Sequence, residues 1–300
     1  MAKFRRNHDR QGKGSSDSII KVGIFSAIIG GLFFIFNKFT GGSDGPTTPV
    51  EENTQYADEY FLPESSTGVI VQHDYFTLSY SEEHEQAEWV AHILMRENLE
   101  KPWNDRTDNF RPDPKIKTGS ATPDDYRNSG YDRGHLVPAA DLAFNEAALS
   151  QSFYMSNITP QARNFNKGIW RELEELTRNW AKKFKKLYVV TGPVLTEPPK
   201  GRIGETGVSV PTAYFKVLLD ISEPELKGIG FLLPNEVNFE PLYKFAVSID
   251  EVEEVINLNL FPDLMSPELE AELESTYNID LWEFSKQKHD LRIQKWNKQN

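Results

Sequence analysis

The sequence contains no cysteine among its 300 residues. Because thiol groups are absent, the fold cannot depend on disulfide bonds, and no metal site can be built from thiolate ligands. A chain of this length buries enough apolar surface to fold without such cross-links. The composition therefore permits export to an oxidising compartment.

Positive charge is also scarce. Lysine and arginine number 33 against 45 aspartates and glutamates, which gives a formal net charge of -12. Residues 1–40 contain seven basic and two acidic side chains, so the remaining 260 residues carry a net charge of -17. Domains that bind nucleic acid usually present a basic surface. Any polyanion site in the larger part of the chain must therefore be a local cluster of cations.

A long uncharged apolar run lies near the N-terminus, between Val22 and Asn37. With its flanks, at 19–39, it approaches the roughly 20 residues that a helix needs to span a bilayer. Residues 1–18 are basic, and 40–58 are rich in Gly, Pro, Thr and acidic residues, as in a flexible linker. The positive-inside tendency predicts a single-pass membrane protein with a cytoplasmic N-terminus and the remaining chain on the non-cytoplasmic side, periplasmic or extracellular in a bacterium. A cleaved signal peptide and a buried core helix are the alternatives; no small-residue cleavage site is evident, which favours retention of the segment.

Residues 59–300 are predicted to form one folded domain of mixed α and β structure. Strand character over Tyr75–Tyr80 and apolar alternation over Glu88–Met95 predict a hairpin, with a helix over Glu88–Met95 as the alternative. Apolar residues at three- and four-residue intervals over Arg163–Leu187 predict an amphipathic helix. Further strands are predicted over Tyr188–Thr191, Val210–Leu219, Gly228–Leu233 and Lys244–Ser248, a helix capped by Asp250 is predicted to run to Asn257, and Ser266–Glu274 is predicted to begin a helical tail over 266–300.

The stretch Ser129–Asp141 contains an acid, a permanent cation, a glycine and an imidazole in succession, Asp132-Arg133-Gly134-His135. An imidazole with a pKa near 6.5 exchanges protons at neutral pH, and a guanidinium group binds phosphate oxygens through a fixed fork of donors. The combination suggests phosphate chemistry. Alone it is a weak signal, because a histidine beside a turn glycine is commonly a structural residue.

A second polar segment runs from Ser156 into the predicted helix and contains Asn157, Asn164, Asn166 and Glu174. If Asn166 and Glu174 lie on one regular helix, about 80° separates them around its axis, and they face one site. The amide oxygen of Asn166 is a hard ligand suited to Mg²⁺, which takes one or two protein ligands together with waters and substrate phosphate oxygens. Asn164 is expected instead to cap the helix.

Taken in order, these motifs resemble the DNA/RNA non-specific endonuclease family of ββα-metal nucleases, which includes endonuclease G-like proteins. The resemblance covers roughly Tyr75 to Leu264. It implies an α+β fold in which a ββα-metal core with a mixed or antiparallel central sheet is flanked by helices. The matching positions are Asp132-Arg133-Gly134-His135 with Pro138, Ser156-Asn157-Ile158 with Pro160-Gln161, Asn166, Gly168, Trp170 and Glu174, Thr191-Gly192-Pro193, Val210-Pro211-Thr212 with Lys216, and Phe231-Leu232-Leu233-Pro234-Asn235.

The resemblance also implies a role for each site residue. His135 would be the general base that takes a proton from the attacking water, and Arg133 would contact the scissile phosphate. Asn166 would hold a single Mg²⁺ ion, for which Mn²⁺ would substitute. Glu174 would orient water at the ion, and Asn157 would support the site.

An arginine upstream of the motif is a further family feature. The sequence offers Arg106 or Arg111 for this position, and Arg106 is preferred. Asp132 is expected to be a structural hydrogen-bond partner, and Lys216 a structural residue within a strand.

Together these features predict a membrane-anchored, Mg²⁺-dependent endonuclease that hydrolyses phosphodiester bonds of DNA and RNA without sequence specificity. The alternatives are a protein of the same fold that captures or takes up nucleic acid without cutting it, and a phosphomonoesterase. The presence of His135, Asn166 and Glu174 together favours the enzyme over the capture protein, since binding alone needs none of that chemistry. Endonuclease G-like proteins often form dimers, so the resemblance also allows a homodimer, for which no interface is identified.

Overall fold

The computed structural model describes residues 61–64 and 67–298. The predicted cytoplasmic segment at 1–18, the apolar segment at 19–39 and the linker at 40–58 lie outside the described residues. Among the residues that are described, no helix has the length and apolar character needed to cross a bilayer.

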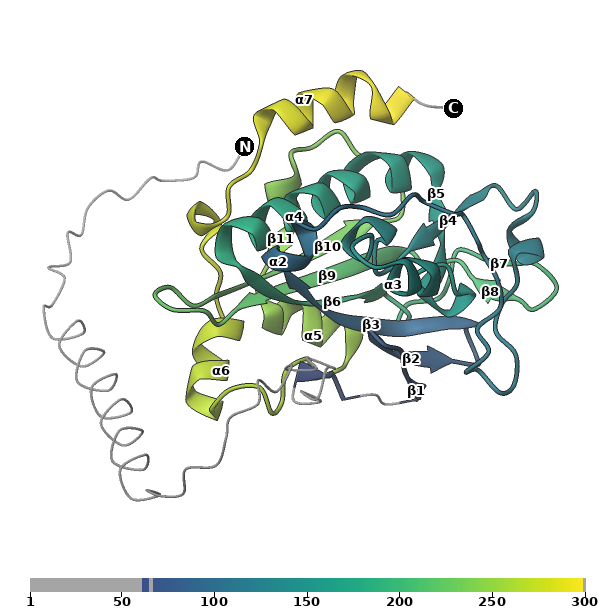
Figure 1. The fold of residues 1–300 in the computed structure, drawn as a ribbon, viewed down its shortest axis with the longest axis horizontal. Coiled ribbons are helices and arrows are strands. Elements are labelled where there is room, and N and C mark those ends of the chain that lie inside the picture. The colour runs from purple at the N-terminus through teal and green to yellow at the C-terminus, as the bar shows by residue number, and fades with distance from the viewer. Residues whose placement is uncertain (1–60, 65–66, 299–300) are drawn as a thin grey trace, which may run out of the picture. The chain divides into compact units, whose positions relative to one another are not determined.

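A seven-stranded sheet forms the centre of the fold, with the order β1-β2-β3-β6-β9-β10-β11 (Figure 1). Every pairing between neighbouring strands is antiparallel, which settles the mixed-or-antiparallel alternative of the sequence prediction. The strands are β1 (Val69–Gln72), β2 (Thr77–Ser81), β3 (Gln86–Met95), β6 (Lys186–Pro193), β9 (Ala213–Asp220), β10 (Lys227–Pro234) and β11 (Ala246–Val247).

Helices cover both faces of this sheet, so its central strands are buried on both sides and are apolar almost throughout. The core on one face contains Leu173 and Trp180 of the long helix α4, and the core on the other contains Val252 of α5. The α-helices are α2 (Arg96–Leu99), α3 (Glu146–Gln151), α4 (Arg171–Phe184), α5 (Ile249–Ile256), α6 (Pro267–Glu274) and α7 (Lys286–Gln294). Short 3₁₀ turns occupy Pro123–Tyr126, Ala139–Asp141, Met155–Asn157, Leu242–Phe245, Ile279–Leu281 and Trp296–Lys298.

Two small sheets lie outside the central one. Strand β4 (Tyr131–His135) pairs antiparallel with β5 (Ile158–Ala162), so the Asp-Arg-Gly-His motif is held directly against the segment that contains the second group of polar residues. The other pair is β7 (Arg202–Ile203) with β8 (Val208–Ser209). The α+β class and the hairpin predicted over residues 75–95 are confirmed by these pairings.

The predicted helix over Arg163–Leu187 begins at Arg163 as expected, but it is interrupted and ends early. Its first part, Phe165–Trp170, is a π-type turn interrupted at Gly168, whose φ of -102° and ψ of -110° are not helical. Regular α-helix resumes at Arg171 and ends at Phe184, and Leu187 belongs to strand β6. The prediction failed because the apolar spacing continues smoothly through a backbone break that side-chain periodicity does not report.

Two capping predictions are also corrected. Helix α5 is capped by Ser248 rather than Asp250, because the Ser248 hydroxyl accepts a hydrogen bond from the Glu251 N–H while the Glu251 carboxylate accepts from the Ser248 N–H. Asn164 precedes the π-type turn, but its side chain caps nothing, and its Oδ1 has no hydrogen-bond partner within the described residues. The predicted start of α6 at Ser266 and Pro267 is confirmed.

Candidate active site

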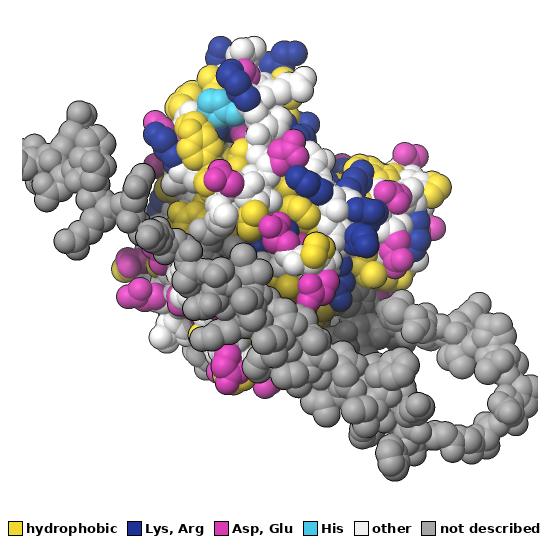
Figure 2. Space-filling view, turned by 90° about the vertical axis from the view of Figure 1, so that its left-hand side faces the viewer, with side chains coloured by type: hydrophobic (Ala, Val, Ile, Leu, Met, Phe, Trp, Pro, Cys, Tyr) yellow, Lys and Arg dark blue, Asp and Glu magenta, His cyan; other side chains and the backbone are white. Residues whose placement is uncertain are grey.

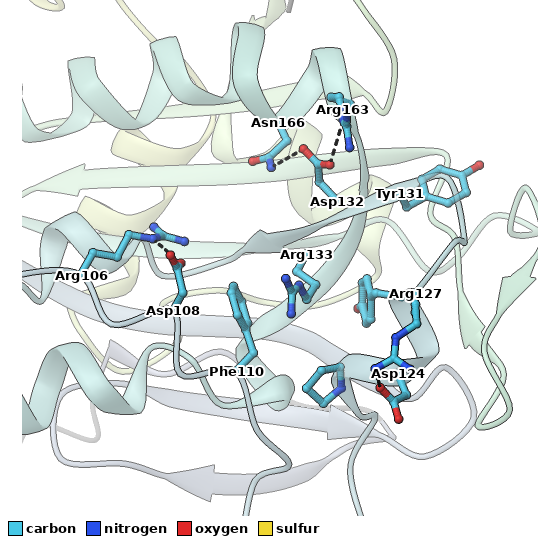
Figure 3. A pocket seen from close by; sticks show the side chains of 12 residues that line it. Arg106, Asp108, Phe110, Asp124, Arg127, Tyr131, Asp132, Arg133, Arg163 and Asn166 are labelled. Carbon is cyan, nitrogen blue, oxygen red and sulfur yellow. Dashed lines mark hydrogen bonds and ion pairs between the residues drawn. The ribbon is translucent and has the colours of Figure 1, made fainter. Parts of the chain in front are cut away.

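A cleft of about 550 Å³ opens beside the β4–β5 pair. Its lining has an excess of positive charge, since four arginines and three aspartates face it (Figure 3). This is the local cluster of cations that the acidic composition required. The lining residues are Arg106, Asp108, Phe110, Pro123, Asp124, Tyr126, Arg127, Tyr131, Asp132, Arg133, Arg163 and Asn166.

Strand β4 explains how the motif is presented to the cleft. Side chains alternate along a strand, so Arg133 and His135 lie on the same face. Gly134, between them, lies opposite β5, where a Cβ atom would stand 2.2 Å from the Gln161 side chain. Only glycine fits this close approach, which explains why it occupies the centre of the motif.

His135 is not among the residues that line the cleft, and only 8% of the residue is exposed. Its ring is 5.5 Å from the ring of Phe110 and 5.1 Å from that of Phe153. Burial, together with the positive charges of Arg106 and Arg133, lowers the pKa of His135 to about 3. The imidazole is therefore neutral at physiological pH, and its Nε2 has no hydrogen-bond partner within the described residues.

Arg133 and Arg106 both stack on aromatic rings near this imidazole. The Arg133 guanidinium carbon lies 4.2 Å from the centre of the Phe110 ring, and that of Arg106 lies 5.0 Å from the centre of Phe153. Arg106 also pairs with Asp108 at 2.6 Å. These contacts hold two guanidinium groups at the cleft in the orientation shown in Figure 3.

Arg111, the alternative to Arg106, points elsewhere. Its Nη1 donates hydrogen bonds to the carbonyl oxygens of Asn109 and Ser150, each at 2.9 Å, and its guanidinium carbon lies 4.1 Å from the Tyr154 ring centre. Arg111 does not line the cleft, so of the two candidates the structure brings only Arg106 to it.

Asn166 lines the cleft from the π-type turn. Its Nδ2 donates to Asp132 Oδ2 at 3.2 Å, and Arg163 Nε lies 3.3 Å from the other oxygen of the same carboxylate. Asp132 thus accepts hydrogen bonds from both side chains, in keeping with the structural role expected of it. Because the amide nitrogen is directed at Asp132, the amide oxygen of Asn166 points away from it (Figure 3) and fits the role of a hard ligand for a divalent cation.

Glu174 does not line the cleft. Because Gly168 breaks the helix between Asn166 and Glu174, the predicted 80° separation on one regular helix does not apply. Burial raises the pKa of Glu174 to about 7, against the opposing effects of Arg178 and Lys216. Lys216 is buried, with its pKa lowered to about 8 mainly by burial, and donates to Thr191 Oγ1 at 2.5 Å, in keeping with a structural role.

Asn157 is fully buried and acts on the backbone that follows His135. Its Oδ1 accepts from the Val137 N–H at 2.9 Å, and its Nδ2 donates to the carbonyl oxygens of Val137 at 3.0 Å and Ser152 at 2.9 Å. The Leu136 N–H also donates to the Asn157 carbonyl oxygen at 3.0 Å. These bonds fix the chain immediately after the imidazole.

Two cleft arginines, Arg127 and Arg163, were missed by the sequence analysis. Arg127 pairs with Asp124, and Arg163 follows the end of strand β5 by one residue. The pairing of β4 with β5 would have placed residue 163 beside the start of the motif, but that register is not visible in the sequence alone.

Comparison with known proteins identifies the family. Residues 54–266 match the DNA/RNA non-specific endonuclease family, which is more than half of the chain. The chain belongs to that family. Nucleases of the family are metal-dependent, and the region matched contains the β4–β5 pair, Asn166 and the arginines of the cleft.

Several relatives share about a third of their residues with this chain. Mitochondrial nuclease EXOG of Danio rerio is 35% identical over 207 residues, covering 64% of this chain and 60% of that protein. Human mitochondrial endonuclease G is 32% identical over 204 residues, covering 64% of this chain and 69% of that protein. Nuclease C1 of Cunninghamella echinulata var. echinulata is 33% identical over 210 residues, covering 65% of this chain and 83% of that protein. The chain spans only 60% and 55% of the Danio rerio and human EXOG proteins.

A solved structure shares the fold. The crystal structure of an EndoG/EndoGI complex, which describes inhibition of EndoG, is 30% identical with a TM-score of 0.60. The similarity covers 67% of this chain and 88% of that chain. The α+β arrangement with its antiparallel sheet is therefore that of the family.

Proposed function

We propose that this protein is a metal-dependent endonuclease that hydrolyses phosphodiester bonds of DNA and RNA without sequence specificity. The observation that carries the proposal is the neutral imidazole of His135, whose Nε2 has no hydrogen-bond partner within the described residues and whose ring contacts Phe110 of a cleft that also contains Arg106 and Arg133. Membership of the family supports the same assignment.

The two arginines prepare the site for a phosphate. Arg133 and Arg106 would donate hydrogen bonds to its non-bridging oxygens, and the bound anion would offset the positive charge that holds the pKa of His135 low. The imidazole then becomes a stronger base when substrate is present. This coupling keeps His135 unprotonated in the free protein and active in the complex.

In the reaction, His135 takes a proton from a water molecule as the water oxygen forms a bond to phosphorus. The bond from phosphorus to the 3′ oxygen breaks, and that oxygen leaves with the electron pair and is protonated from solvent. Asn157 positions His135 through the backbone bonds at Leu136 and Val137.

Asn166 would hold the divalent cation through its amide oxygen, and we propose Mg²⁺, for which Mn²⁺ would substitute. The ion would supply stabilisation of the negative charge on the phosphate and on the leaving oxygen. Glu174, which lies on α4 outside the lining of the cleft, is proposed to orient water at the ion. Because arginine contacts to phosphate and sugar read no base, the cleft would accept any sequence.

The test uses the full-length chain with supercoiled plasmid and with RNA, in Mg²⁺, Mn²⁺ or EDTA. Cutting of both substrates in Mg²⁺, loss of cutting in EDTA, and a loss of at least a hundredfold in His135→Ala are expected. His289→Ala is the matched control, since His289 lies outside the cleft, and it should cut at the wild-type rate. Equal cutting by His135→Ala and wild type would sink the mechanism.

Capture of nucleic acid without cutting is the second candidate. The recessed position of His135 and its low pKa favour it, because both weaken an imidazole as a base. Retention of DNA with no cutting in any divalent cation would establish this alternative and reject the nuclease.

We also propose that the apolar segment at 19–39 anchors the chain, with residues 1–18 in the cytoplasm and the nuclease domain on the other side of the membrane. The uncharged run and its basic flank support this topology. Protease added to intact cells should digest the C-terminal domain, and full protection of that domain would refute the orientation.

A further inference from the structure

Three carboxylates gather between helices α5 and α6, far along the chain from the motif. Asp250 and Glu253 lie one turn apart on α5, and Glu274 is the last residue of α6. One oxygen from each side chain lies within 4.8 Å of the other two. Asp250 is exposed and Glu253 half-buried, so the group is open to solvent on one side.

Glu274 distinguishes this group from an ordinary acidic surface. The residue is only 3% exposed, and its Oε1 has no hydrogen-bond partner within the described residues. A buried carboxylate oxygen without a partner is costly and requires a proton or a cation. Within the part of the chain that the structure describes, the charged groups that act on Glu274 are acidic, namely Asp250, Glu253 and Glu270.

Neighbouring contacts keep the three side chains in place. Glu253 Oε1 accepts a hydrogen bond from the Leu260 N–H at 2.7 Å, which orients its carboxylate. Both helices are seated closely on strand β10, since a Cβ atom at Gly228 would lie 2.6 Å from Ile249 Cδ1 and 3.2 Å from the Leu273 carbonyl oxygen.

We propose that Asp250, Glu253 and Glu274 bind a divalent cation, with Ca²⁺ as the ion that fits. Ca²⁺ takes oxygen ligands at about 2.4 Å in flexible geometry, so oxygens on opposite sides of it are about 4.8 Å apart. Three carboxylate oxygens no farther apart than 4.8 Å fit around one such ion with room for water. The ion would join α5 to α6.

This site is separate from the proposed nuclease centre. Val252 of α5 and Leu273 of α6 pack in the core on one face of the central sheet, whereas Phe165 and Trp170, which flank Asn166, pack in the core on the other face. The ion would stabilise the fold rather than contact substrate.

Protonation is the alternative to a cation as the means of relieving the repulsion among the three carboxylates. Burial and the neighbouring carboxylates raise the pKa of Glu274 to about 8, and burial raises that of Glu253 to about 7. A cluster that is relieved by protons alone would respond to pH but not to Ca²⁺. The two explanations therefore differ in a measurable way.

The experiment uses the full-length chain carrying Asn166→Ala, so that the proposed nuclease metal site is removed from the measurement. After treatment with EDTA, Ca²⁺ at about a hundred times its dissociation constant should raise Tm by roughly 5–10 °C. Calorimetry should give one ion per chain. Adding Glu274→Gln should weaken Ca²⁺ binding at least tenfold, while Glu254→Gln, an exposed neutral substitution on the same helix, should leave it unchanged.

Glu274→Gln should keep or raise Tm in EDTA, because it removes a buried charge. If that variant does not fold, Asp250→Asn at the exposed side of the cluster serves in its place. The same Ca²⁺ response in the cluster variant and the Glu254→Gln control would overturn the site. Failure of Ca²⁺ to change Tm at any pH would also overturn it and leave protonation as the explanation.

Discussion

His135 shows how the surroundings of one side chain set its chemistry. An exposed histidine is partly protonated near pH 6.5, but burial and the charges of Arg106 and Arg133 keep this one neutral until about pH 3. The same charges that lower its pKa are the ones proposed to receive the phosphate. The free protein therefore holds an unprotonated imidazole that substrate binding would activate.

A pH-dependent loss of stability follows from this shift. In the unfolded chain His135 gains a proton below about pH 6.5, whereas in the folded chain it stays neutral to about pH 3, so acid favours unfolding. The contribution of the neutral imidazole to the free energy of unfolding is fully present above pH 6.5 and is lost as the pH falls toward 3. In urea unfolding between pH 7 and 5, the free energy of unfolding should fall more steeply with decreasing pH for wild type than for His135→Gln, by up to about 1.4 kcal/mol per pH unit. Parallel slopes would mean that the folded imidazole is protonated.

Gly134 is predicted to resist substitution. A Cβ atom there would lie 2.2 Å from the buried Gln161 side chain, so Gly134→Ala should destabilise the fold by about 1–3 kcal/mol in urea unfolding. Gly201→Ala is the control, because nothing lies within 4 Å of its Cβ position. Shortening the neighbour with Gln161→Ala should reduce the effect of Gly134→Ala, and an unchanged effect would show that the contact is not the cause.

At the scale of elements, the C-terminal segment packs against the helix that follows Asn166. Figure 1 shows α7 alongside α4. Buried Arg292 donates to Glu172 Oε2 and to the Glu240 carbonyl oxygen, each at 2.6 Å, and the Arg171 guanidinium carbon lies 4.2 Å from the Trp296 ring centre. This segment lies beyond residue 266, where the family match ends.

Arg292 is expected to be essential to this packing. Arg292→Leu leaves the buried Glu172 carboxylate without its cation and should lower the free energy of unfolding by about 3–5 kcal/mol. Removing both charges, with Arg292→Leu and Glu172→Leu, should recover part of the loss. Lys286→Ala, which breaks an exposed ion pair on the same helix, should change little. An equally small change in the free energy of unfolding of Arg292→Leu would contradict the proposed role of Arg292 in packing α7 against α4.

On the scale of the whole molecule, an acidic protein presents a locally basic cleft. The face in Figure 2 shows Lys and Arg in small groups among acidic side chains, without a continuous basic surface. The net charge of -12 repels a polyanion at a distance, while the four arginines attract it at the cleft. Binding should therefore depend on short-range contacts and on salt.

Salt dependence provides a test of this balance. If the cleft contacts two to four phosphates, the logarithm of the binding constant should fall with log salt at a slope of about -2 to -4 for double-stranded DNA. Measured with the non-cutting His135→Ala chain, Arg163→Ala should reduce the slope by about one. Lys182→Ala, an exposed cation outside the cleft, should leave the slope unchanged. Equal slopes for His135→Ala alone and for its combinations with Arg163→Ala and Lys182→Ala would show that Arg163 does not contact the DNA, and the DNA would then bind outside this cleft.

The sequence by itself determined the features that depend on neighbours along the chain. Strand alternation predicted the hairpin over 75–95, Ser266 with Pro267 marked the start of α6, and the ordered motifs identified the family. The motif also pointed to His135 and Arg133, and the second polar segment pointed to Asn166, because their chemical types suit phosphate and a hard cation. These signals are local, so no tertiary contact was needed to read them.

Tertiary structure decided the rest, because the deciding contacts join distant parts of the chain. The break at Gly168 lies against Asn297, whose Oδ1 would stand 2.5 Å from a Cβ atom there, and apolar spacing could not report it. Arg163, which follows β5, became a cleft residue through the pairing of β4 with β5, and Arg127 lies at the end of the 3₁₀ turn Pro123–Tyr126, which lines the same cleft. The low pKa of His135 likewise arises mainly from burial, with contributions from Arg106, which the fold brings near it, and from Arg133 of the motif itself.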